Sequence, residues 1–465
     1  MNVCMVTTFF GSRSFGGDAA YVDRLSRALL RAGHRVEVIH CGDAFEAVRG
    51  AHPPRPYEAP EGLRIHTLAS RFGFLSPLAT QQTGRPWFKT SRLKALLDRP
   101  DWDVIHFHNI SLVGGPGVLE LGRPEAVKLM TAHEHWLICP MHLLWKENRK
   151  PCDSPQCGRC MIRGRRPPQL WRFGSSMARG LSHLDALLFP SQYALDEHAR
   201  RGVTGNLVKL PYFLPEDWAG TRGAITPPGR SGAADSPAKA RPILAAAGRL
   251  VKMKGFQTLI PLMDHLPEAD LVIAGTGPYE TTLRRLAQPL PNVIFAGLLS
   301  GSGLADLFAR ARAVVVPSLF PETFGYVVAE AFSMATPVVA HRGGGAIVET
   351  AVETGGGLGY DTPDQLLTAL RRMIHDDRLR ERLARNALET CRTVWSESAH
   401  LERYYQLIES LRRRKREGRA SGPAVRFDAA AVAFAPPHVA TTPAGQPLVT
   451  LGPPPHSRSS VVRES

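Results

Sequence analysis

The chain carries two successive series of short apolar segments that alternate with helical patterns, and this alternation constrains its fold more than any other feature. In the first series, the segments expected to form strands are residues 3–7, 35–40, 63–68, 104–107, 127–131 and 186–189. The clearest helical patterns of this series cover residues 17–31 and 192–201. Short apolar strands separated by helices predict an α/β unit with a doubly wound parallel sheet.

A second series follows a break in composition. Its expected strands are residues 243–247, 271–274, 293–296, 314–316 and 338–340. Its expected helices are residues 256–266, 279–287, 304–311, 363–375 and 378–390. Residues 226–242 are rich in Pro, Gly, Ser and Ala, which is typical of a linker. We therefore expect a first domain at 1–215, a linker at 216–242 and a second domain at 243–395.

The end of the chain has a different character. An amphipathic helix is expected at residues 396–417, and its last turns contain the basic run 412–416. These cations complement the negative end of the helix dipole, and contact with an anionic lipid is the alternative. Residues 418–465 show no helical or strand periodicity, so this tail is predicted to be disordered.

Length and charge limit the functional classes. A chain of 465 residues is too long for one ordinary core, and its formal net charge of +15 favours an anionic partner such as a phosphate, a nucleic acid or an anionic membrane. Seven cysteines are few for this length and argue against a disulfide-rich extracellular protein. The first residues have no basic segment of a signal peptide, and no apolar stretch is long enough for a membrane helix. We expect a cytoplasmic protein, with peripheral contact to the inner face of a membrane left open.

The segment 317–349 contains two acids that are expected to share one unit of the second domain. Glu322 and Glu330 stand eight positions apart around Phe324 and Gly325. With a helix expected at 324–335, Glu330 would lie about 10 Å along the axis from the helix start. Because a helix N-terminus attracts anions, the two carboxylates could hold hydroxyl groups on either side of a bound phosphate. Two solvated helix glutamates are the alternative.

Two cations are expected near this pair. In the sequence G-R-L-V-K-M-K-G, Arg249 and Lys254 lie on a loop between a strand and a helix, with Lys252 as the fallback for Lys254. Both would project from the top of the sheet. Arg offers a planar fork for phosphate oxygens there, and Lys offers a point charge. Ordinary surface cations on a basic protein are the alternative.

The pattern P-E-x-F-G-x-x-x-x-E, followed by P-V-V-A and a glycine run, resembles the retaining glycosyltransferases of family 4. The resemblance covers roughly residues 2–410 and implies the GT-B fold, with two Rossmann-like domains that face a central cleft. It assigns the first domain to the acceptor and the second to a nucleotide-sugar donor. By this resemblance Arg249 and Lys254 hold the diphosphate, Glu322 contacts the donor sugar and Glu330 contacts the ribose. The amides of Phe324 and Gly325 would face the phosphates.

The first domain supplies further candidates. Gly16 and Gly17 lie in the glycine-rich loop 9–18, where backbone amides can approach a donor closely. His133 lies in T-A-H-E-H-W at the end of an expected strand and resembles the histidine that the family places near the transferred sugar. Glu134 replaces the usual Asp, and the role of Glu349 behind the glycine run is left open. An ordinary βα turn and a structural histidine are the alternatives.

Four cysteines gather within the expected insert 139–166. Cys139, Cys152, Cys157 and Cys160 have the spacing C-x12-C-x4-C-x2-C. Four thiolates suit tetrahedral zinc, and part of the spacing also matches an iron–sulfur pattern. We favour a structural zinc because the loop has no evident redox partner. Free thiols in a mobile loop are the alternative.

The resemblance implies an enzyme that transfers a sugar from a nucleotide-diphosphate sugar to an acceptor, with retention and without a catalytic metal. The acceptor would be a sugar, a lipid-linked sugar or a polysaccharide, which places the reaction in polysaccharide or glycolipid biosynthesis. Nucleic acid is not expected as a partner. A non-catalytic nucleotide-sugar binding protein, or an epimerase or phosphorylase of the same fold, are the alternatives.

Overall fold

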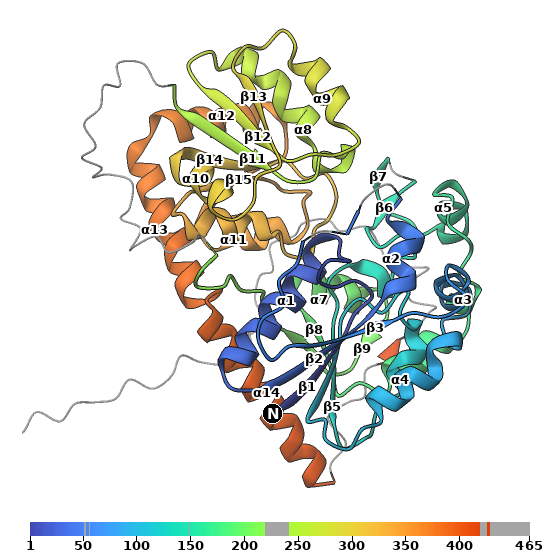
Figure 1. Ribbon diagram of the computed structural model, residues 1–465. Helices are drawn as coiled ribbons and strands as arrows, with labels where there is room; N and C mark the ends of the chain where they lie inside the picture. Colours follow the sequence, from blue (N-terminus) through green and yellow to red (C-terminus); the bar gives the residue numbers. More distant parts are fainter. Residues whose placement is uncertain (51–52, 55, 148, 219–240, 419–425, 428–465) are drawn as a thin grey trace, which may run out of the picture.

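The computed structural model describes residues 1–418 and 426–427, except for 51–52, 55, 148 and 219–240. Its described part forms two α/β domains and a long C-terminal helix (Figure 1). Most of the predicted linker and of the predicted disordered tail lies outside the described residues. Two residues of the tail, Arg426–Phe427 (β17), pair antiparallel with Val203–Thr204 (β9).

The N-terminal domain is built on a seven-stranded sheet with the order β10-β8-β5-β4-β1-β2-β3. All neighbours in it are parallel. The strands are Asn2–Val6 (β1), Arg35–Cys41 (β2), Arg64–Leu68 (β3), Val104–Phe107 (β4), Val127–Thr131 (β5), Ala186–Phe189 (β8) and Leu207–Lys209 (β10). The six predicted strands are thus confirmed, and β10 is added at the edge.

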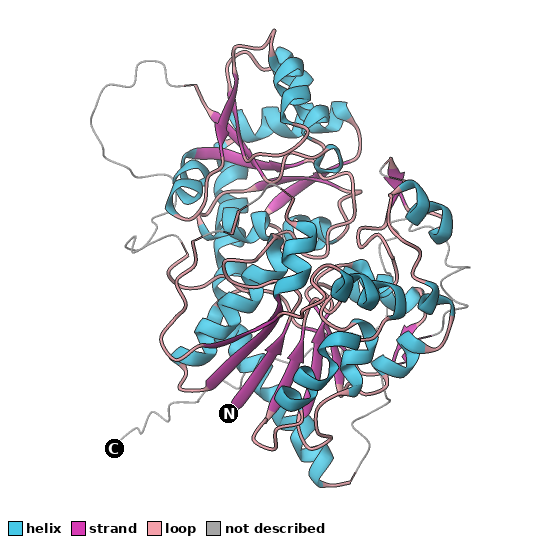
Figure 2. Cartoon of the chain, turned by 45° about the vertical axis from the view of Figure 1, so that its right-hand side comes forward, coloured by secondary structure: helices cyan, strands magenta, loops and turns pink. Residues whose placement is uncertain are grey.

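Helices cover both faces of this sheet (Figure 2). The α-helices are Gly16–Arg31 (α1), Gly42–Val48 (α2), Leu75–Thr83 (α3), Thr90–Leu97 (α4), Cys157–Arg163 (α5), Ser176–Leu181 (α6) and Gln192–Arg200 (α7). Short 3₁₀ turns are Trp87–Lys89 (η1), Gly115–Glu120 (η2), His135–Leu137 (η3) and Leu170–Phe173 (η4). The cysteine insert also contains a small hairpin of Trp145–Lys146 (β6) and Lys150–Pro151 (β7).

The C-terminal domain has a six-stranded parallel sheet with the order β13-β12-β11-β14-β15-β16. The strands are Ile243–Ala247 (β11), Asp270–Ala274 (β12), Val293–Gly297 (β13), Ala311–Val316 (β14), Val338–His341 (β15) and Gly357–Tyr360 (β16). The helical segments are Lys252–Lys254 (η5), Phe256–Leu259 (α8), Ile260–His265 (η6), Glu280–Ala287 (α9), Ser302–Arg310 (α10), Tyr326–Ser333 (α11), Val348–Glu353 (η7), Pro363–His375 (α12) and Asp377–Thr393 (α13).

Two boundaries in this domain differ from the prediction. The single helix predicted at 256–266 divides into α8 and η6, because Pro261 lies in the first turn of η6 and cannot donate a backbone hydrogen bond. The helix predicted at 324–335 is shorter at both ends. Gly325 has φ 85° and precedes α11, whereas Ala335 has φ 55° and follows it. Neither conformation continues a right-handed helix.

The predicted C-terminal helix, Glu397–Arg416 (α14), returns to the N-terminal domain. Tyr404 of α14 is fully buried, and its hydroxyl lies 3.1 Å from Nδ1 of His106 on β4. At the basic end, Arg412 pairs with Asp103 and Lys415 pairs with Asp185 at 2.8 Å. Part of the basic run therefore fastens the helix to the first domain. One buried apolar cluster accordingly contains residues of both domains and of α14.

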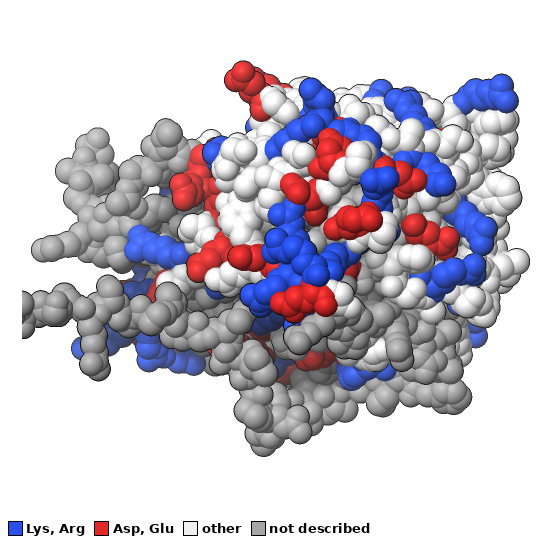
Figure 3. Space-filling model, turned by 90° about the horizontal axis from the view of Figure 1, so that it is seen from below, with Lys and Arg blue, Asp and Glu red and all other residues white. Residues whose placement is uncertain are grey.

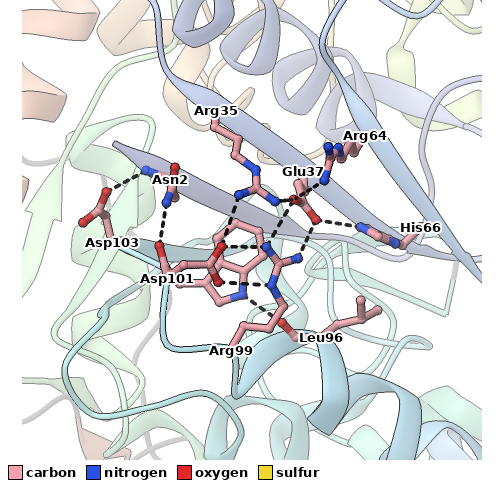
Figure 4. A network of polar contacts seen from close by, with 10 residues as sticks. Asn2, Arg35, Glu37, Arg64, His66, Leu96, Arg99, Asp101 and Asp103 are labelled. Carbon is pink, nitrogen blue, oxygen red and sulfur yellow. Dashed lines mark hydrogen bonds and ion pairs between the residues drawn. The ribbon is translucent and has the colours of Figure 1, made fainter.

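A charged network closes the amino-terminal edge of the first sheet (Figure 4). Glu37 of β2 has only 1% of its surface exposed, and its carboxylate lies 2.5 Å from Arg35, 2.9 Å from Arg99 and 2.8 Å from His66. Burial alone would raise the pKa of Glu37, but hydrogen bonds from His66, Arg99 and Arg35 hold that pKa below its usual value. This edge is a satisfied structural network.

Candidate active site between the two domains

The loops that carry the predicted donor residues meet at the carboxyl ends of β11 and β14. Nζ of Lys254 lies 2.8 Å from Oε1 of Glu322, and the Ser318 hydroxyl donates to the same oxygen. The side chains of Lys254 and Glu322 are 22% and 11% exposed. The structure thus brings together a cation and a carboxylate that are far apart in the sequence, and both remain accessible to a ligand.

Glycines allow these loops to approach so closely. Gly255 has φ 77°, and a Cβ atom there would lie 1.8 Å from the carbonyl oxygen of Pro317. A Cβ on Gly345, at φ 68°, would lie 2.8 Å from the carbonyl oxygen of Glu322. No side chain fits at either position. Close packing against the loop of Glu322 therefore explains the glycine at position 345, in the run behind that acid.

Arg249 lies on the same loop as Lys254 but is exposed. Its side chain makes no hydrogen bond or ion pair with another described residue, so the guanidinium is available for an anion. Lys252, the fallback for Lys254, is also exposed, and Glu322 pairs with Lys254 and not with Lys252. The predicted joint role of Arg249 and Lys254 on a diphosphate stays a prediction.

The start of α11 presents free backbone donors. Within the described chain, the amides of Phe324 and Gly325 donate no hydrogen bond. Phe324 is buried, with 2% of its surface exposed, and a Cβ on Gly325 would lie 2.1 Å from the Ile347 side chain. Because unpaired amides at a helix start attract anions, this turn can hold phosphate oxygens beside Lys254.

Glu330 of α11 faces the N-terminal domain. Its carboxylate lies 3.7 Å from Nη2 of Arg24 on α1, and both side chains are 16% exposed. The Arg24 guanidinium also lies over the ring of Tyr326, 4.4 Å from its centroid. Burial raises the pKa of Glu330, and Arg24 offsets part of that rise. Sequence reasoning missed Arg24, because its partners belong to the other domain.

The glycine-rich loop of the first domain lies against the same turn. Gly16 and Gly17 open α1 and are exposed, and a Cβ on Gly17 would lie 3.6 Å from the Tyr326 ring. The predicted donor residues of the two domains are therefore brought to one place.

His133 lies at the boundary between the domains. Its Nδ1 is 2.5 Å from the Tyr212 hydroxyl, and its Nε2 is 3.0 Å from Nδ1 of His108. Its carbonyl oxygen accepts a hydrogen bond of 2.7 Å from Thr323, the neighbour of Glu322. Burial lowers the pKa of His133 to about 3, so the ring is neutral at pH 7. With both ring nitrogens engaged by protein groups, His133 positions the loop, and its predicted catalytic role stays a prediction.

A pair of carboxylates lies beside this histidine at the carboxyl edge of the first sheet. The Asn109 amide nitrogen donates to Asp18 at 3.1 Å and to Glu134 at 3.3 Å. Nδ1 of His142 lies 2.5 Å from the Glu134 carboxylate. Burial, and then the charge of Glu134, raise the pKa of Asp18 to about 6. Sequence reasoning missed this pair, although Asn109 and Glu134 each follow a predicted strand that ends at this edge.

Glu349, whose role the sequence left open, bridges the domains. Its carboxylate accepts hydrogen bonds of 2.9 Å from the amides of Gln192 and Tyr193, which open α7. Lys209 of β10 lies 2.5 Å from the same carboxylate. A carboxylate at a helix N-terminus is stabilised by the free amides and the helix dipole. Glu349 therefore fastens the second domain to the first.

The four cysteines of the insert are the residues predicted to hold a structural zinc. No group of three or more His, Cys, Asp or Glu side chains in the described part of the chain is placed to hold a metal ion. Cys139, Cys152, Cys157 and Cys160 are all free thiols. Burial raises the pKa of Cys152 to about 11. Burial also raises the pKa of Cys157, which lies close enough to Cys139 and Cys160 for their charges to raise that pKa further. The zinc hypothesis stays a prediction.

Comparison with protein families divides the chain at the same place as the fold. Residues 15–211 match the family model "Glycosyltransferase Family 4", and residues 233–390 match "Glycosyl transferases group 1". The first match lies within the N-terminal domain. The second contains Arg249, Lys254, Glu322 and Glu330.

Individual relatives of the chain also have the names of sugar-transferring enzymes. Sulfoquinovosyl transferase of Arabidopsis thaliana is 36% identical over 32% of this chain, and the match covers 30% of that protein. D-inositol 3-phosphate glycosyltransferase of Xylanimonas cellulosilytica is 29% identical over 84% of this chain and 91% of its own length.

Solved structures show the same fold over most of the chain. Sucrose-phosphate synthase from Thermosynechococcus elongatus superimposes with a TM-score of 0.62 at 19% identity, covering 88% of this chain and 99% of that one. HepE of Anabaena, solved in complex with UDP, gives a TM-score of 0.58 at 16% identity, with 88% and 100% coverage. The chain therefore has the GT-B fold, and it carries a domain that matches glycosyltransferase family 4 followed by a domain that matches the glycosyl transferases of group 1.

Proposed function

We propose that this glycosyltransferase moves a sugar from a nucleotide-diphosphate sugar to an acceptor, with retention of the anomeric configuration and without a catalytic metal. The observation that carries the proposal is the accessible Lys254–Glu322 pair beside the free amides of Phe324 and Gly325. UDP is present in the Anabaena HepE structure of the same fold, which supports a nucleotide as the donor's leaving group here.

In this proposal the diphosphate is held by Lys254, Arg249 and the amides at the start of α11. These positive groups stabilise the leaving group more as the anomeric bond breaks than before. Glu322, which is paired with Lys254, then accepts hydrogen bonds from hydroxyls of the donor sugar. Glu330 binds the ribose.

Retention follows from attack on the same face that the diphosphate leaves. The leaving phosphate oxygen takes the proton of the acceptor hydroxyl, so no side chain is needed as a covalent nucleophile. The neutral His133 ring then serves to position the loop beside the transferred sugar.

The acceptor is proposed to bind at the N-terminal domain, where Asp18 and Glu134 can accept hydrogen bonds from its hydroxyls. Relatives of the chain include a Corynebacterium glutamicum enzyme named as a phosphatidylinositol monomannoside mannosyltransferase. This name supports a sugar or lipid-linked acceptor, and a role in polysaccharide or glycolipid biosynthesis. Within the described chain, no helix is long and apolar enough to cross a membrane. The cytoplasmic location stays a prediction.

The experiment begins with a thermal-shift screen of nucleotide sugars, because a ligand that binds only the folded protein raises its melting temperature. With the donor found, Lys254→Ala is compared with Lys252→Ala, an exposed lysine on the same loop. Lys254→Ala should lower turnover by about 100-fold, which corresponds to ~2.7 kcal/mol, and Lys252→Ala should change it little.

Three outcomes would contradict the proposal. Equal turnover in the two lysine variants would remove the assigned role of Lys254. Release of nucleotide without any acceptor dependence would favour an epimerase or phosphorylase. Binding of donor with no product for any sugar acceptor would favour a non-catalytic binding protein.

A further inference from the structure

Large apolar side chains that are exposed concentrate on one side of the N-terminal domain. Among the described residues, most of them fall in two segments, 62–97 and 154–184. The exposed fractions reach 65% for Phe74, 69% for Leu170 and 70% for Phe173. We call the surface formed by Phe72, Phe74, Leu75, Leu78, Trp87, Phe88, Ile162, Leu170 and Phe173 the apolar face.

The two segments form one continuous surface. The rings of Phe72 and Phe88 lie 4.2 Å apart. Across the segments, the indole of Trp171 donates to the carbonyl of Gln81 at 2.9 Å, and Gln81 donates to the carbonyl of Pro167 at 2.8 Å. In Figure 1, α3, α4 and α5 lie on the right of the N-terminal domain, away from α13 and from the C-terminal domain.

The same two segments carry positive charge without negative charge. Neither 62–97 nor 154–184 contains a single Asp or Glu. Arg71, Arg85, Arg165 and Arg166 are exposed and make no ion pair with another described residue. Elsewhere the charges are mixed: Figure 3 shows Lys and Arg interspersed with Asp and Glu on the face seen from below.

We propose that the apolar face is a docking surface for a membrane that contains anionic lipid. Exposed Phe, Leu and Trp side chains insert at the boundary between headgroups and acyl chains, and arginines around them attract anionic headgroups. This combination fits a bilayer better than a protein partner, because it would be costly to leave several unpaired arginines against a neutral protein surface.

The face is also connected to the acceptor side of the site. Arg172, between Leu170 and Phe173, donates to the carbonyl of Trp136 at 2.7 Å and lies 4.9 Å from the centroid of its ring. Trp136 belongs to the loop that begins with His133 and Glu134. A membrane at the apolar face would therefore lie beside the edge where the acceptor is proposed to bind. This placement deepens the proposed function, but docking itself does not depend on catalysis.

The basic end of α14, which is the alternative membrane contact, is less suited to binding a bilayer than the apolar face. Arg412 and Lys415 are already paired with Asp103 and Asp185. The remaining cations there, Arg413, Arg414 and Arg416, are exposed without a neighbouring apolar surface on the helix end.

The test is cosedimentation of the full chain with vesicles of phosphatidylcholine containing 30% phosphatidylglycerol, and with vesicles of phosphatidylcholine alone. The wild type should sediment with the anionic vesicles only. The triple variant F74S/L170S/F173S should reduce the partition coefficient by about tenfold or more. Its matched control is L286S/I294S/L298S, which removes three exposed apolar side chains from the C-terminal domain.

A second pair of variants separates the two basic regions. R71Q/R165Q/R166Q should weaken vesicle binding by about tenfold or more, and R413Q/R414Q/R416Q should leave it nearly unchanged. Donor-induced thermal stabilisation, measured for every variant, shows that the fold and the donor site are retained. Failure of the wild type to bind anionic vesicles would overturn the proposal. So would loss of binding only in the α14 variant, or a dimer in ultracentrifugation that the F74S/L170S/F173S variant dissolves.

Discussion

Two carboxylates at opposite edges of the first sheet have different partners and oppositely shifted pKa values, although both belong to the same domain. Glu37, at the amino-terminal edge, is surrounded by Arg35, Arg99 and His66 within hydrogen-bond distance. Asp18, at the carboxyl edge, shares one amide of Asn109 with a second carboxylate, Glu134. The surroundings therefore lower the pKa of Glu37 and raise that of Asp18.

The difference separates structural charge from charge that is kept for a ligand. At the amino-terminal edge each acid has its cations, so the native state is stabilised and no group is left for a substrate. At the carboxyl edge the acids repel each other, and this cost persists in the folded protein. Perturbed groups of this kind cluster at functional sites. The site between the domains extends the pattern, because among the described residues the carboxylate of Glu330 pairs with one cation, Arg24, at 3.7 Å.

The largest effect on stability is expected for Glu37→Gln. Removing one charge from a buried network leaves its arginines unpaired, which should lower the free energy of unfolding by about 3 kcal/mol. The measurement is urea unfolding at pH 7, with turnover of the remaining native protein unchanged. Glu46→Gln is the matched control, since Glu46 is 52% exposed, belongs to the same domain and also pairs with an arginine. Its effect should stay below about 1 kcal/mol.

The Glu37 network also has a pH signature. Since folding lowers the pKa of Glu37, its contribution is complete above the unfolded value and is lost as pH falls through the folded value. The difference between wild type and Glu37→Gln should therefore shrink towards acid pH. A constant difference from pH 7 to pH 3 would show that the network does not act through the charge of Glu37.

Asp18→Asn should act in the opposite direction on stability. Folding raises the pKa of Asp18 to about 6, so the stability linked to this group is complete below the unfolded value and is lost as pH rises to about 6. Removing the charge should stabilise the protein by about 1 to 2 kcal/mol at pH 8 and by less at pH 4. At the same time the Michaelis constant for acceptor should rise by about tenfold, at ~1.4 kcal/mol per decade.

Asn109→Ala is the useful companion to that variant. It removes the amide shared by Asp18 and Glu134 but neither carboxylate, so it should destabilise the protein at pH 8. If Asp18→Asn instead lowered both stability and donor affinity, Asp18 would belong with Glu37 as a structural acid. The comparison between the two edges of the sheet would then fail.

Most of the fold could be predicted from the sequence, because apolar segments and their spacing mark strands and helices locally. The strand β16 escaped prediction because Gly357 and Gly359 interrupt its apolar pattern. The helix at Glu330 was predicted too long because the φ values of Gly325 and Ala335 are set by tertiary contacts as well as by residue type.

The candidate site was predictable to the extent that its residues form one motif. Lys254 and Glu322 were expected together and lie together. Arg24, Asp18 and the bridging role of Glu349 were not expected, because each depends on a partner in another element or the other domain. Such partners are brought close only by the packing of the whole chain.

The smallest expected effect concerns the four thiols of the insert. They show whether this third region is a satisfied structural site, like the surroundings of Glu37, or holds unsatisfied groups, like the surroundings of Asp18. Cys139 and Cys160 are buried and Cys152 and Cys157 partly so, all without a metal-binding arrangement in the described residues. If zinc binds, the insert becomes a satisfied structural site, and protein purified under reducing, chelator-free conditions should carry about one zinc per chain. Cys157→Ser should then lose the metal and raise protease sensitivity within 139–166, with donor affinity unchanged. Cys391→Ser, a cysteine of α13 with 9% exposure, is the control and should keep the metal. Elemental analysis that finds no metal in the wild type would leave the insert as a segment of free thiols.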